Sequence, residues 1–222
     1  MDEIKLIEIK EGILTDNDLA AERLRKRLKT EKTFVVNLMS SPGAGKTTLL
    51  LKTIAMLKLT YKTGVVEADI DSMVDAEKIR EAGVASVQLR TGGFCHLDSN
   101  MVSQGLEALG SEHFDLVFIE NVGNLVCPAE FDTGAIKNVM ILSVPEGDDK
   151  PLKYPLMFST CDVLIVNKTD MLSLSDFDMQ KLYGHISRLN PNMEIFQVSA
   201  KTGDGIEQWV GWLKEQVSDF MK

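Results

Sequence analysis

The chain has 222 residues, and its 24 basic and 33 acidic residues give a formal net charge of −9. The length suits one domain with a full hydrophobic core, and the acidic balance argues against nucleic-acid binding through a basic face. No run approaches the ~18 apolar residues of a membrane helix, and the first residues lack a signal-peptide core. Three cysteines without a secretion signal are expected to be thiols or metal ligands, so we expect a cytoplasmic protein without a membrane partner.

The first part of the chain, residues 1–32, is expected to form a short helical segment ahead of the main domain at 33–222. Asp16 or Asp18 could cap a helix that has leucines on one face and basic side chains on the others. A docked surface helix with a solvated basic face is the favoured interpretation. A partner-binding helix is the alternative.

The central motif lies between a predicted strand at 33–39 and a predicted helix at 49–57. It reads Ser40-Ser41-Pro42-Gly43-Ala44-Gly45-Lys46-Thr47-Thr48. A strand, a Gly-rich turn, Gly-Lys-Thr and a helix are the context of a P-loop, whose backbone N–H groups bind phosphate at a helix N-terminus. Lys46 is expected to reach the β and γ oxygens, and the Thr47 hydroxyl to ligate Mg²⁺. Ser40 replaces the usual first glycine, but the flanking elements still favour a nucleoside triphosphate site.

Alternating strands and helices follow this motif. Strands are predicted at 64–68, 86–89, 115–120, 137–144, 161–166 and 194–198, and helices at 73–82, 97–109, 175–189 and 204–221. Most of these strands are continuous apolar runs, which predicts a three-layer α/β/α fold with a mostly parallel sheet covered on both faces. Ligands bind such sheets at the carboxyl ends of the strands, where most of the polar motifs fall.

A base-recognition motif, Asn167-Lys168-Thr169-Asp170, follows a buried-type strand. An Asp carboxylate can accept from both the ring N–H and the amino group of guanine, a donor pair that adenine lacks. Asn167 could bond the guanine edge, and the stem of Lys168 could cover the base. A solvated turn is the alternative, but a strand end downstream of a P-loop favours guanine. Ser199-Ala200-Lys201 resembles the remaining base-contact loop of GTPases, in which the Ala200 N–H would meet the guanine oxygen.

Acidic residues near two strand ends could complete the phosphate and magnesium site. Glu120 and Gly123 stand where many GTPases carry D-x-x-G, so Glu120 can hold Mg²⁺ through water and the Gly123 N–H can sense the γ-phosphate. Asp69 and Asp75 lie where a switch loop is expected, and either could ligate Mg²⁺ or orient the attacking water. We favour Asp69 for magnesium, although one of these acids could instead cap the following helix. No Gln or Arg is obviously placed to accelerate hydrolysis, so we expect slow turnover.

A second constellation comprises Cys95, His96 and Cys127. Thiolate and imidazole suit Zn²⁺ or Ni²⁺, and three ligands fall short of the four that a closed site requires. A two-fold axis could supply the missing ligands from a second subunit. Buried thiols and a helix-capping histidine would explain the same residues, and the spacing alone leaves both interpretations open. Cys161 opens an apolar strand and is expected to be a core thiol.

Taken together, these motifs resemble the hydrogenase nickel-incorporation GTPases of the HypB family over nearly the whole chain. The matching stretches are 40–47, 95–98, 119–129, 146–149 and 167–170. The resemblance implies a GTPase that binds Mg²⁺, dimerises with GTP, and binds nickel or zinc through Cys95, His96 and Cys127 near the subunit interface. It also implies delivery of nickel to a [NiFe]-hydrogenase large-subunit precursor, with the small zinc-containing accessory protein of that pathway as a partner.

Two features depart from some members of that family. An N-terminal Cys-x-x-Cys-Gly-Cys or His-rich tract is missing, since no cysteine or histidine precedes Cys95, so N-terminal nickel storage is not expected. Asn100 stands where some members have a second histidine, which leaves the ligand set open. The alternatives are a regulatory or targeting switch with structural cysteines, and a GTPase that serves urease or a cobalamin-linked enzyme. A small-molecule kinase would have no use for N-K-x-D.

Overall fold

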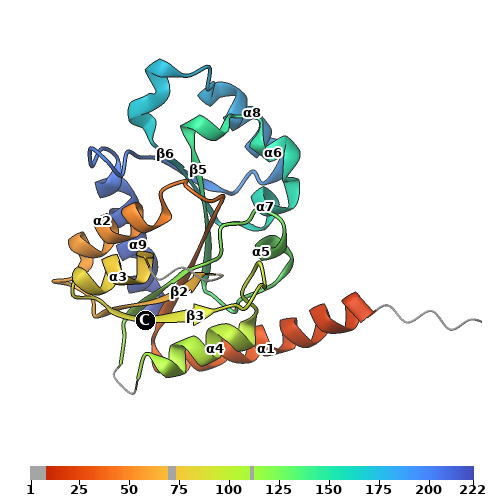
Figure 1. Cartoon of the computed structure of the whole chain (residues 1–222), viewed down its shortest axis with the longest axis vertical. Coiled ribbons are helices and arrows are strands. Elements are labelled where there is room, and N and C mark those ends of the chain that lie inside the picture. Colours follow the sequence, from red (N-terminus) through yellow and green to blue (C-terminus); the bar gives the residue numbers. More distant parts are fainter. Residues whose placement is uncertain (1–8, 70–73, 111–112) are drawn as a thin grey trace, which may run out of the picture.

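The computed structural model describes residues 9–69, 74–110 and 113–222 (Figure 1). In this part of the chain a seven-stranded sheet has the order β3-β2-β4-β1-β5-β6-β7, and all of its pairings are parallel. The strands are β1 (Phe34–Ser40), β2 (Thr63–Asp69), β3 (Ala85–Arg90), β4 (Leu116–Glu120), β5 (Lys137–Ser143), β6 (Val163–Asn167) and β7 (Glu194–Gln197). The predicted parallel sheet is therefore confirmed.

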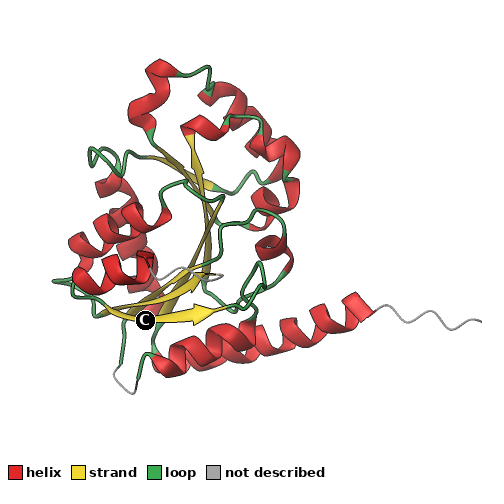
Figure 2. Cartoon of the chain, viewed as in Figure 1, coloured by secondary structure: helices red, strands yellow, loops and turns green. Residues whose placement is uncertain are grey.

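Helices cover both faces of the sheet, as Figure 2 shows. The longer helices are α1 (Ile9–Glu31), α2 (Lys46–Leu57), α3 (Val74–Glu81), α4 (Ser99–Ala108), α8 (Met179–Leu189) and α9 (Ile206–Met221). The short ones are α5 (Cys127–Glu130), α6 (Lys150–Lys153) and α7 (Pro155–Thr160), with 3₁₀ turns η1 (Val144–Glu146) and η2 (Thr169–Leu174). Described helices are nowhere both long and apolar enough to cross a membrane.

The two sheet faces carry separate apolar cores. Phe34 and Val36 of β1 pack with α2, α3 and α9, whereas Val35, between them, packs with α1 and α4 on the opposite face. Met39 joins a third cluster under α7 and α8. Because successive strand residues point to opposite faces, a sheet with two covered faces needs apolar residues at every position. This explains the continuous apolar runs in the sequence.

Strand register brings the predicted motifs to one edge of the sheet. Leu38 lies opposite Glu120 in the β1–β4 pair, so the carboxyl end of β4 adjoins the start of the P-loop. Ser143 lies opposite Asn167, which places the base-recognition motif beside the end of β5. The phosphate, magnesium and base motifs therefore share one edge, as expected of a parallel sheet.

Several predicted element boundaries were wrong. The first helix already begins at Ile9, so Asp16 and Asp18 lie inside α1 and do not cap it. An aspartate that precedes a leucine-rich helix face can be the N-cap of that helix. It can equally be an exposed residue inside a longer helix, as Asp16 and Asp18 are here. The helices α5, α6 and α7 were not predicted from the sequence. Each has proline at its first or second position, where the missing N–H costs nothing, and each is too short for an apolar periodicity.

Candidate nucleotide and metal sites

The P-loop has the backbone geometry that its glycines predict. Gly43 and Gly45 have φ values of 74° and 96°, in the left-handed region that side chains disfavour. A Cβ on Gly45 would also lie 2.5 Å from the side-chain nitrogen of Asn167. Gly45 is the residue before α2, so the first N–H groups of that helix border the loop. This arrangement forms an anion-binding helix N-terminus.

The departure from the usual P-loop pattern has a structural role. The Lys46 ammonium donates to the Ser40 hydroxyl oxygen at 2.9 Å, and that hydroxyl in turn donates to the carbonyl of Ser41 at 2.6 Å. Ser40 is fully buried at the end of β1. Its side chain therefore orients Lys46 along the loop, which a glycine at this position would not do.

Magnesium-type ligands meet beside the loop. The Thr47 hydroxyl donates to the Glu120 carboxylate at 2.7 Å, and Glu120 is 4% exposed at the end of β4. Asp69, the last residue of β2, lines the same cavity of about 370 Å³. Hydroxyl and carboxylate oxygens are the donors that Mg²⁺ prefers, so these residues fit that ion. Asp75 lies in α3, but its side chain falls outside the described side chains, so its predicted role stays a prediction.

The sequence did not indicate one charged residue of this site, Lys78, or one buried acid beside it, Glu67, which does not line the cavity. Lys78 of α3 lines the phosphate-side cavity, although in the sequence it resembles a solvated helix residue. Glu67 is buried in β2 and is the register partner of Glu120. A lone acid within the apolar run of β2 was the signal that could have drawn attention to Glu67.

A second cavity, of about 430 Å³, adjoins the first and contains the base-recognition motif. Gly45 and Thr48 line both cavities, which together extend from the phosphate loop to the base-contact loops. The residues that line the second cavity are Gly45, Thr48, Asn167, Lys168, Asp170, Met171, Leu174, Ala200 and Lys201. Concave sites of this size are typical of small-molecule ligands. Met171 and Leu174 of η2 were not predicted from the sequence.

The side chains of this motif connect the P-loop to the base-contact loop. Asn167 donates to the carbonyl of Ala44 at 2.9 Å and accepts from the backbone N–H of Ala200 at 3.1 Å. Asn167 thus joins the two loops, and the contacts of Asn167 and the Ala200 N–H with a guanine base stay predictions. The Lys168 ammonium donates to the carbonyl of Gly43 at 2.7 Å, which lays its stem between the two cavities. Ser199 donates to Asp170 at 2.7 Å and orients that carboxylate.

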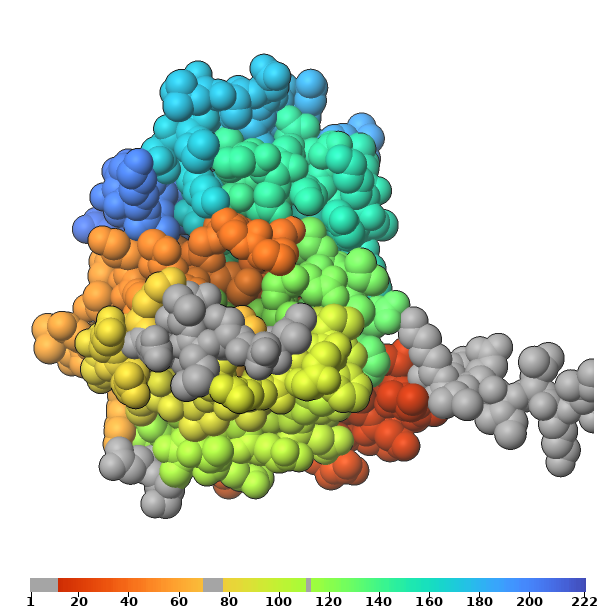
Figure 3. Space-filling model, viewed as in Figure 1, coloured from red at the N-terminus to blue at the C-terminus, as the bar shows by residue number. Residues whose placement is uncertain are grey.

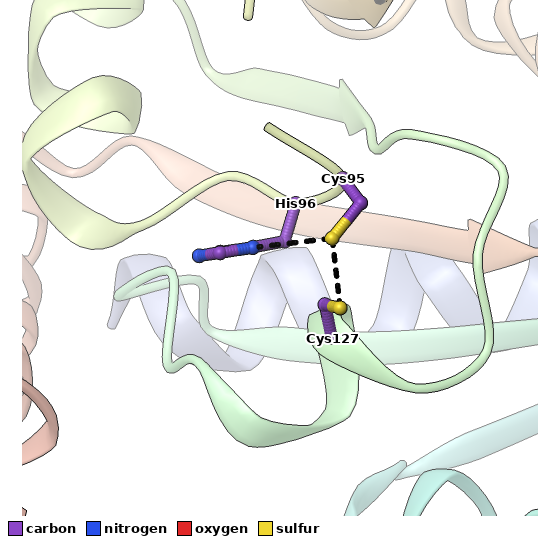
Figure 4. Close-up of side chains that lie close together, drawn as sticks. All are labelled: Cys95, His96 and Cys127. Atoms are coloured by element: carbon purple, nitrogen blue, oxygen red, sulfur yellow. Dashed lines mark hydrogen bonds between the residues drawn. The ribbon is translucent and has the colours of Figure 1, made fainter. Parts of the chain in front are cut away.

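The predicted metal residues lie together (Figure 4). The Cys95 and Cys127 sulfurs are 2.8 Å apart, and the Cys95 sulfur is 3.9 Å from Nδ1 of His96. Potential ligand atoms of all three residues lie within 4.8 Å of one another, and each residue is half-buried. Two sulfurs and an imidazole suit Zn²⁺ or Ni²⁺. The remaining thiol, Cys161, is buried in the core as predicted.

Local contacts and burial shift the pKa values of Cys95 and His96. The hydrogen bond shared with Cys127, followed by partial burial, raises the pKa of the Cys95 thiol. Burial lowers the pKa of His96, so its imidazole is neutral at pH 7 and able to ligate a metal. The imidazole stacks on Phe131, with ring centroids 3.9 Å apart, which fixes the plane of the ring.

Asparagine side chains connect the two loops that carry the triad. Asn124 donates to the carbonyl of Cys95 at 3.3 Å and accepts from the N–H of Val126 at 2.9 Å. Asn121 accepts from the N–H of Leu97 at 3.3 Å. Both asparagines lie in the segment that leads from Glu120 to Cys127. Their amides therefore tie the Cys95-His96 loop to the segment that borders the phosphate-side cavity.

The phosphate cavity and the triad are joined by one short segment. Gly123 lies so close to the P-loop that a Cβ would be 3.0 to 3.2 Å from three atoms of Pro42. Cys127 begins α5, four positions further along the chain. On the surface, the orange residues of the P-loop and α2 adjoin the green residues that follow β4 (Figure 3). Gly123 and Cys127 therefore lie in one short segment that borders both sites.

Comparison with known proteins agrees with this geometry. Residues 34–197 match the "CobW/HypB/UreG, nucleotide-binding domain" family. The fold and the nucleotide site thus define a P-loop nucleotide-binding protein of the CobW/HypB/UreG class, a class of GTPases. Within that class, the chain belongs to the HypB family of hydrogenase maturation factors.

Individual relatives cover most of the chain. It is 47% identical over 212 residues to the hydrogenase maturation factor HypB of Azotobacter chroococcum, covering 96% of this chain and 70% of that protein. It is 41% identical over 216 residues to the hydrogenase/urease maturation factor HypB of Helicobacter pylori, covering 96% and 88%. The crystal structure of HypB from Helicobacter pylori in complex with nickel superposes with a TM-score of 0.87 at 39% identity, covering 93% of this chain and 97% of that one. The resemblance seen in the sequence is confirmed.

Proposed function

We propose that this protein is a GTP-hydrolysing metallochaperone that binds nickel and delivers it during [NiFe]-hydrogenase maturation. The observation that carries the proposal is that one segment, 120–127, borders the phosphate cavity at one end and supplies a thiol to the metal triad at the other. Relatives of the chain are named hydrogenase maturation factors, and one similar structure is described as a complex with nickel.

GTP occupies the two joined cavities in this proposal. Guanine lies over Lys168 with its N–H groups on Asp170, and the phosphates lie on the loop from Gly43 to Thr48. Water attacks the γ-phosphorus and the bond to the β–γ bridging oxygen breaks, which gives GDP and phosphate. Lys46 stabilises the charge on the transferred group, and Asp69 or Asp75 orients the water.

Magnesium, when bound, would neutralise charge on the β and γ oxygens. Thr47 would supply a hydroxyl ligand and Asp69 a carboxylate, and Glu120 would help to hold the ion through water. The Thr47–Glu120 hydrogen bond already orients two of these groups toward one point of the cavity. Lys78 lines the same cavity and adds a cation to it, but no arginine of the described residues lines it. We therefore retain slow intrinsic hydrolysis as part of the proposal.

Replacing Glu120 by glutamine is expected to weaken magnesium-dependent GTP hydrolysis. Glutamine can still accept from Thr47, but it lacks the charge that attracts the ion, so we expect kcat to fall about 10-fold at fixed Mg²⁺. Phosphate release at several Mg²⁺ concentrations measures the change, which should be partly recovered at high Mg²⁺. Glu67→Gln is the matched control, because Glu67 is an equally buried acid on the neighbouring strand. Equal losses in both variants would contradict the role assigned to Glu120.

Nickel is the cargo, held by Cys95, His96 and Cys127, with zinc as the competing ion at the same donors. Three ligands leave a position for a donor from outside the chain. We propose that GTP favours a homodimer in which these loops meet, and that the cargo passes to a hydrogenase large-subunit precursor with help from a small zinc-containing accessory protein. The name of the Helicobacter pylori relative also mentions urease, so the client enzyme needs a direct test.

The two sites are coupled in this proposal through Gly123. A γ-phosphate that accepts from the Gly123 N–H would fix the segment from Gly123 to Cys127, and with it the distance from Cys127 to Cys95 and His96. GTP and GDP would then favour different metal affinities. By linkage, the metal must change the affinity for the nucleotide by the same factor.

Replacing Gly123 by alanine is expected to disturb this coupling. The added Cβ would press on Pro42 at 3.0 to 3.2 Å, and two of the three atoms it meets there are backbone atoms that yield poorly. Strain of about 1–3 kcal/mol is typical of such overpacking, so the affinity for a non-hydrolysable GTP analogue should fall about 10-fold. GDP affinity should stay within about threefold, because GDP has no group at the Gly123 N–H. Fluorescence titration with both nucleotides distinguishes the two; equal losses would contradict a γ-phosphate sensor.

A further inference from the structure

The helix α1 lies against both segments that follow the metal ligands. It runs beside α4, which begins shortly after His96 (Figure 1). It also forms hydrogen bonds with the stretch that follows α5 and Cys127. Its residue Asn17 is 5% exposed, while the neighbouring residues Asp16 and Asp18 are exposed. A buried amide in a polar stretch of a surface helix needs a specific set of partners.

Asn17 finds those partners on both metal-bearing segments. Its side-chain oxygen accepts from the backbone N–H of Ser99 at 3.0 Å and from the Ser99 hydroxyl at 2.9 Å. Its side-chain nitrogen donates to the carbonyl of Asp132 at 2.9 Å. Ser99 is three residues after His96, and Asp132 is five residues after Cys127. One amide therefore joins the segment that carries Cys95 and His96 to the segment that carries Cys127.

Other contacts hold α1 firmly against the second segment. Arg25 donates to the carbonyl of Ala135 at 3.1 Å and forms an ion pair with Asp132. The same Asp132 oxygen accepts from the N–H of Gly134 at 2.9 Å. A Cβ on Gly134 would lie 2.8 Å from a methyl carbon of Leu24, so the helix and the loop are in close contact. These contacts hold α1, and therefore the Asn17 side chain, in a fixed position relative to residues 132–135.

We propose that Asn17 is a positioning residue for the metal triad, and that α1 is therefore a structural part of the nickel site. The proposal rests on the proposed role of Cys95, His96 and Cys127 as nickel ligands. The asparagines 121 and 124 join the two loops from within the domain, and Asn17 joins the same segments from α1. Without the amide, the start of α4 and the stretch after α5 lose their shared partner, and the thiols lose their fixed separation.

The test compares Asn17→Ala with Leu28→Ala, a variant of the same helix. Leu28 is fully buried at the other end of α1, where it lines a cavity with Phe114 and Val117. Both variants weaken the docking of α1, but only the first removes the link between the metal-bearing segments. Residues that support metal ligands typically change affinity by about 10- to 100-fold, so Asn17→Ala should raise the dissociation constant for Ni²⁺ about 10-fold and shift the thiolate-to-nickel absorption bands.

Three further results complete the test. Leu28→Ala should leave the Ni²⁺ dissociation constant and the bands unchanged even where its Tm falls as far as that of Asn17→Ala. Ser99→Ala, which removes only the hydroxyl donor, should change nickel affinity in the same direction by a smaller factor. GDP affinity should stay within about twofold in all variants, because none of the three residues lines the nucleotide cavities. Equal nickel affinities in Asn17→Ala and the parent chain would overturn the proposal.

A metal-free measurement separates this inference from the proposed function. Phenylarsine oxide bridges two close thiols through two As–S bonds and releases water, so it reports the separation of Cys95 and Cys127 without nickel. Asn17→Ala should weaken this reaction, whereas Leu28→Ala should not. If the parent chain binds no nickel but Asn17→Ala still loses arsenical affinity, the proposed cargo is wrong and the positioning role stands. If the arsenical affinity is unchanged, the positioning role is wrong whatever the cargo.

Discussion

Replacing Cys127 by alanine is expected to raise the dissociation constant for Ni²⁺ by at least about 100-fold and to remove most of the thiolate-to-nickel absorption. Loss of a direct ligand should exceed the 10- to 100-fold effect that is typical of supporting residues. The remaining thiol of the described residues, Cys161, is buried in the core, so it cannot replace the lost ligand without a large rearrangement. Equilibrium titration with absorbance detection measures both effects.

Cys161→Ala provides the matched control for this result. Cys161 is the third thiol of the chain, but it is fully buried in the core under α7 and α8, and burial raises its pKa. Its replacement should lower Tm through lost packing and leave nickel affinity unchanged. Nickel binding that survives in Cys127→Ala but disappears in Cys161→Ala would show that the triad is not the metal site.

Replacing Asp170 by asparagine is expected to weaken GTP binding by about 10²- to 10⁴-fold. Its carboxylate, oriented by Ser199 at 2.7 Å, would accept two hydrogen bonds from guanine. Hydrogen bonds to a charged group contribute about 1.5–3 kcal/mol each, and asparagine places a donor opposite one guanine donor. Displacement of a fluorescent GDP analogue measures the loss.

Xanthosine triphosphate gives this prediction an internal control. Xanthine carries a carbonyl oxygen where guanine has its amino group, so the asparagine side-chain N–H can donate a hydrogen bond to it. Asp170→Asn should therefore bind xanthosine triphosphate better than the parent chain does. Asp204→Asn, on the nearby loop where Asp204 pairs with the Thr202 hydroxyl, should leave the preference for guanine intact. Unchanged base preference in Asp170→Asn would contradict base recognition by this carboxylate.

The fold was predictable because its determinants are local. Continuous apolar runs such as β4, buried at every residue, indicate strands covered on both faces. The parallel order then follows from helices that alternate with them. The P-loop was predictable for the same reason, since its glycines and its lysine act within one turn. Ser40 departs from the usual pattern, but its side chain contacts Lys46 of the same loop, so the departure did not obscure the P-loop.

The triad was only half predictable, because its donors come from two segments far apart in the sequence. The residue types suggested a metal, but only the fold shows that the sulfurs are adjacent. Resemblance to a family supplied what the spacing could not. The structure brings Cys95, His96 and Cys127 together. No further cysteine or histidine of the described residues belongs to this cluster.

Long-range amide contacts could not be predicted from the sequence. Asn121 donates to Asn37 at 3.1 Å, and Asn37 donates to Asn138 at 3.0 Å, so a chain of amides runs from the end of β4 through β1 to β5. Asn17 and Asn167 likewise join segments that are distant in sequence. An asparagine has no periodicity that reveals its partner, and its usual preference is for turns and caps. The sequence therefore did not reveal the contact of Asn167 with the P-loop or the contacts of Asn17 with Ser99 and Asp132.

The measurement that tests the account most directly is a nickel titration of the chain with a non-hydrolysable GTP analogue and again with GDP, recording thiolate-to-nickel absorption and molar mass together. The coupling through Gly123 predicts different nickel affinities in the two nucleotide states, with the GTP state dimeric. By linkage, nickel should shift nucleotide affinity by the same factor. Equal nickel affinity in the two states would contradict the coupling. A monomer without thiolate bands in either state would support a GTP-dependent switch that carries no metal.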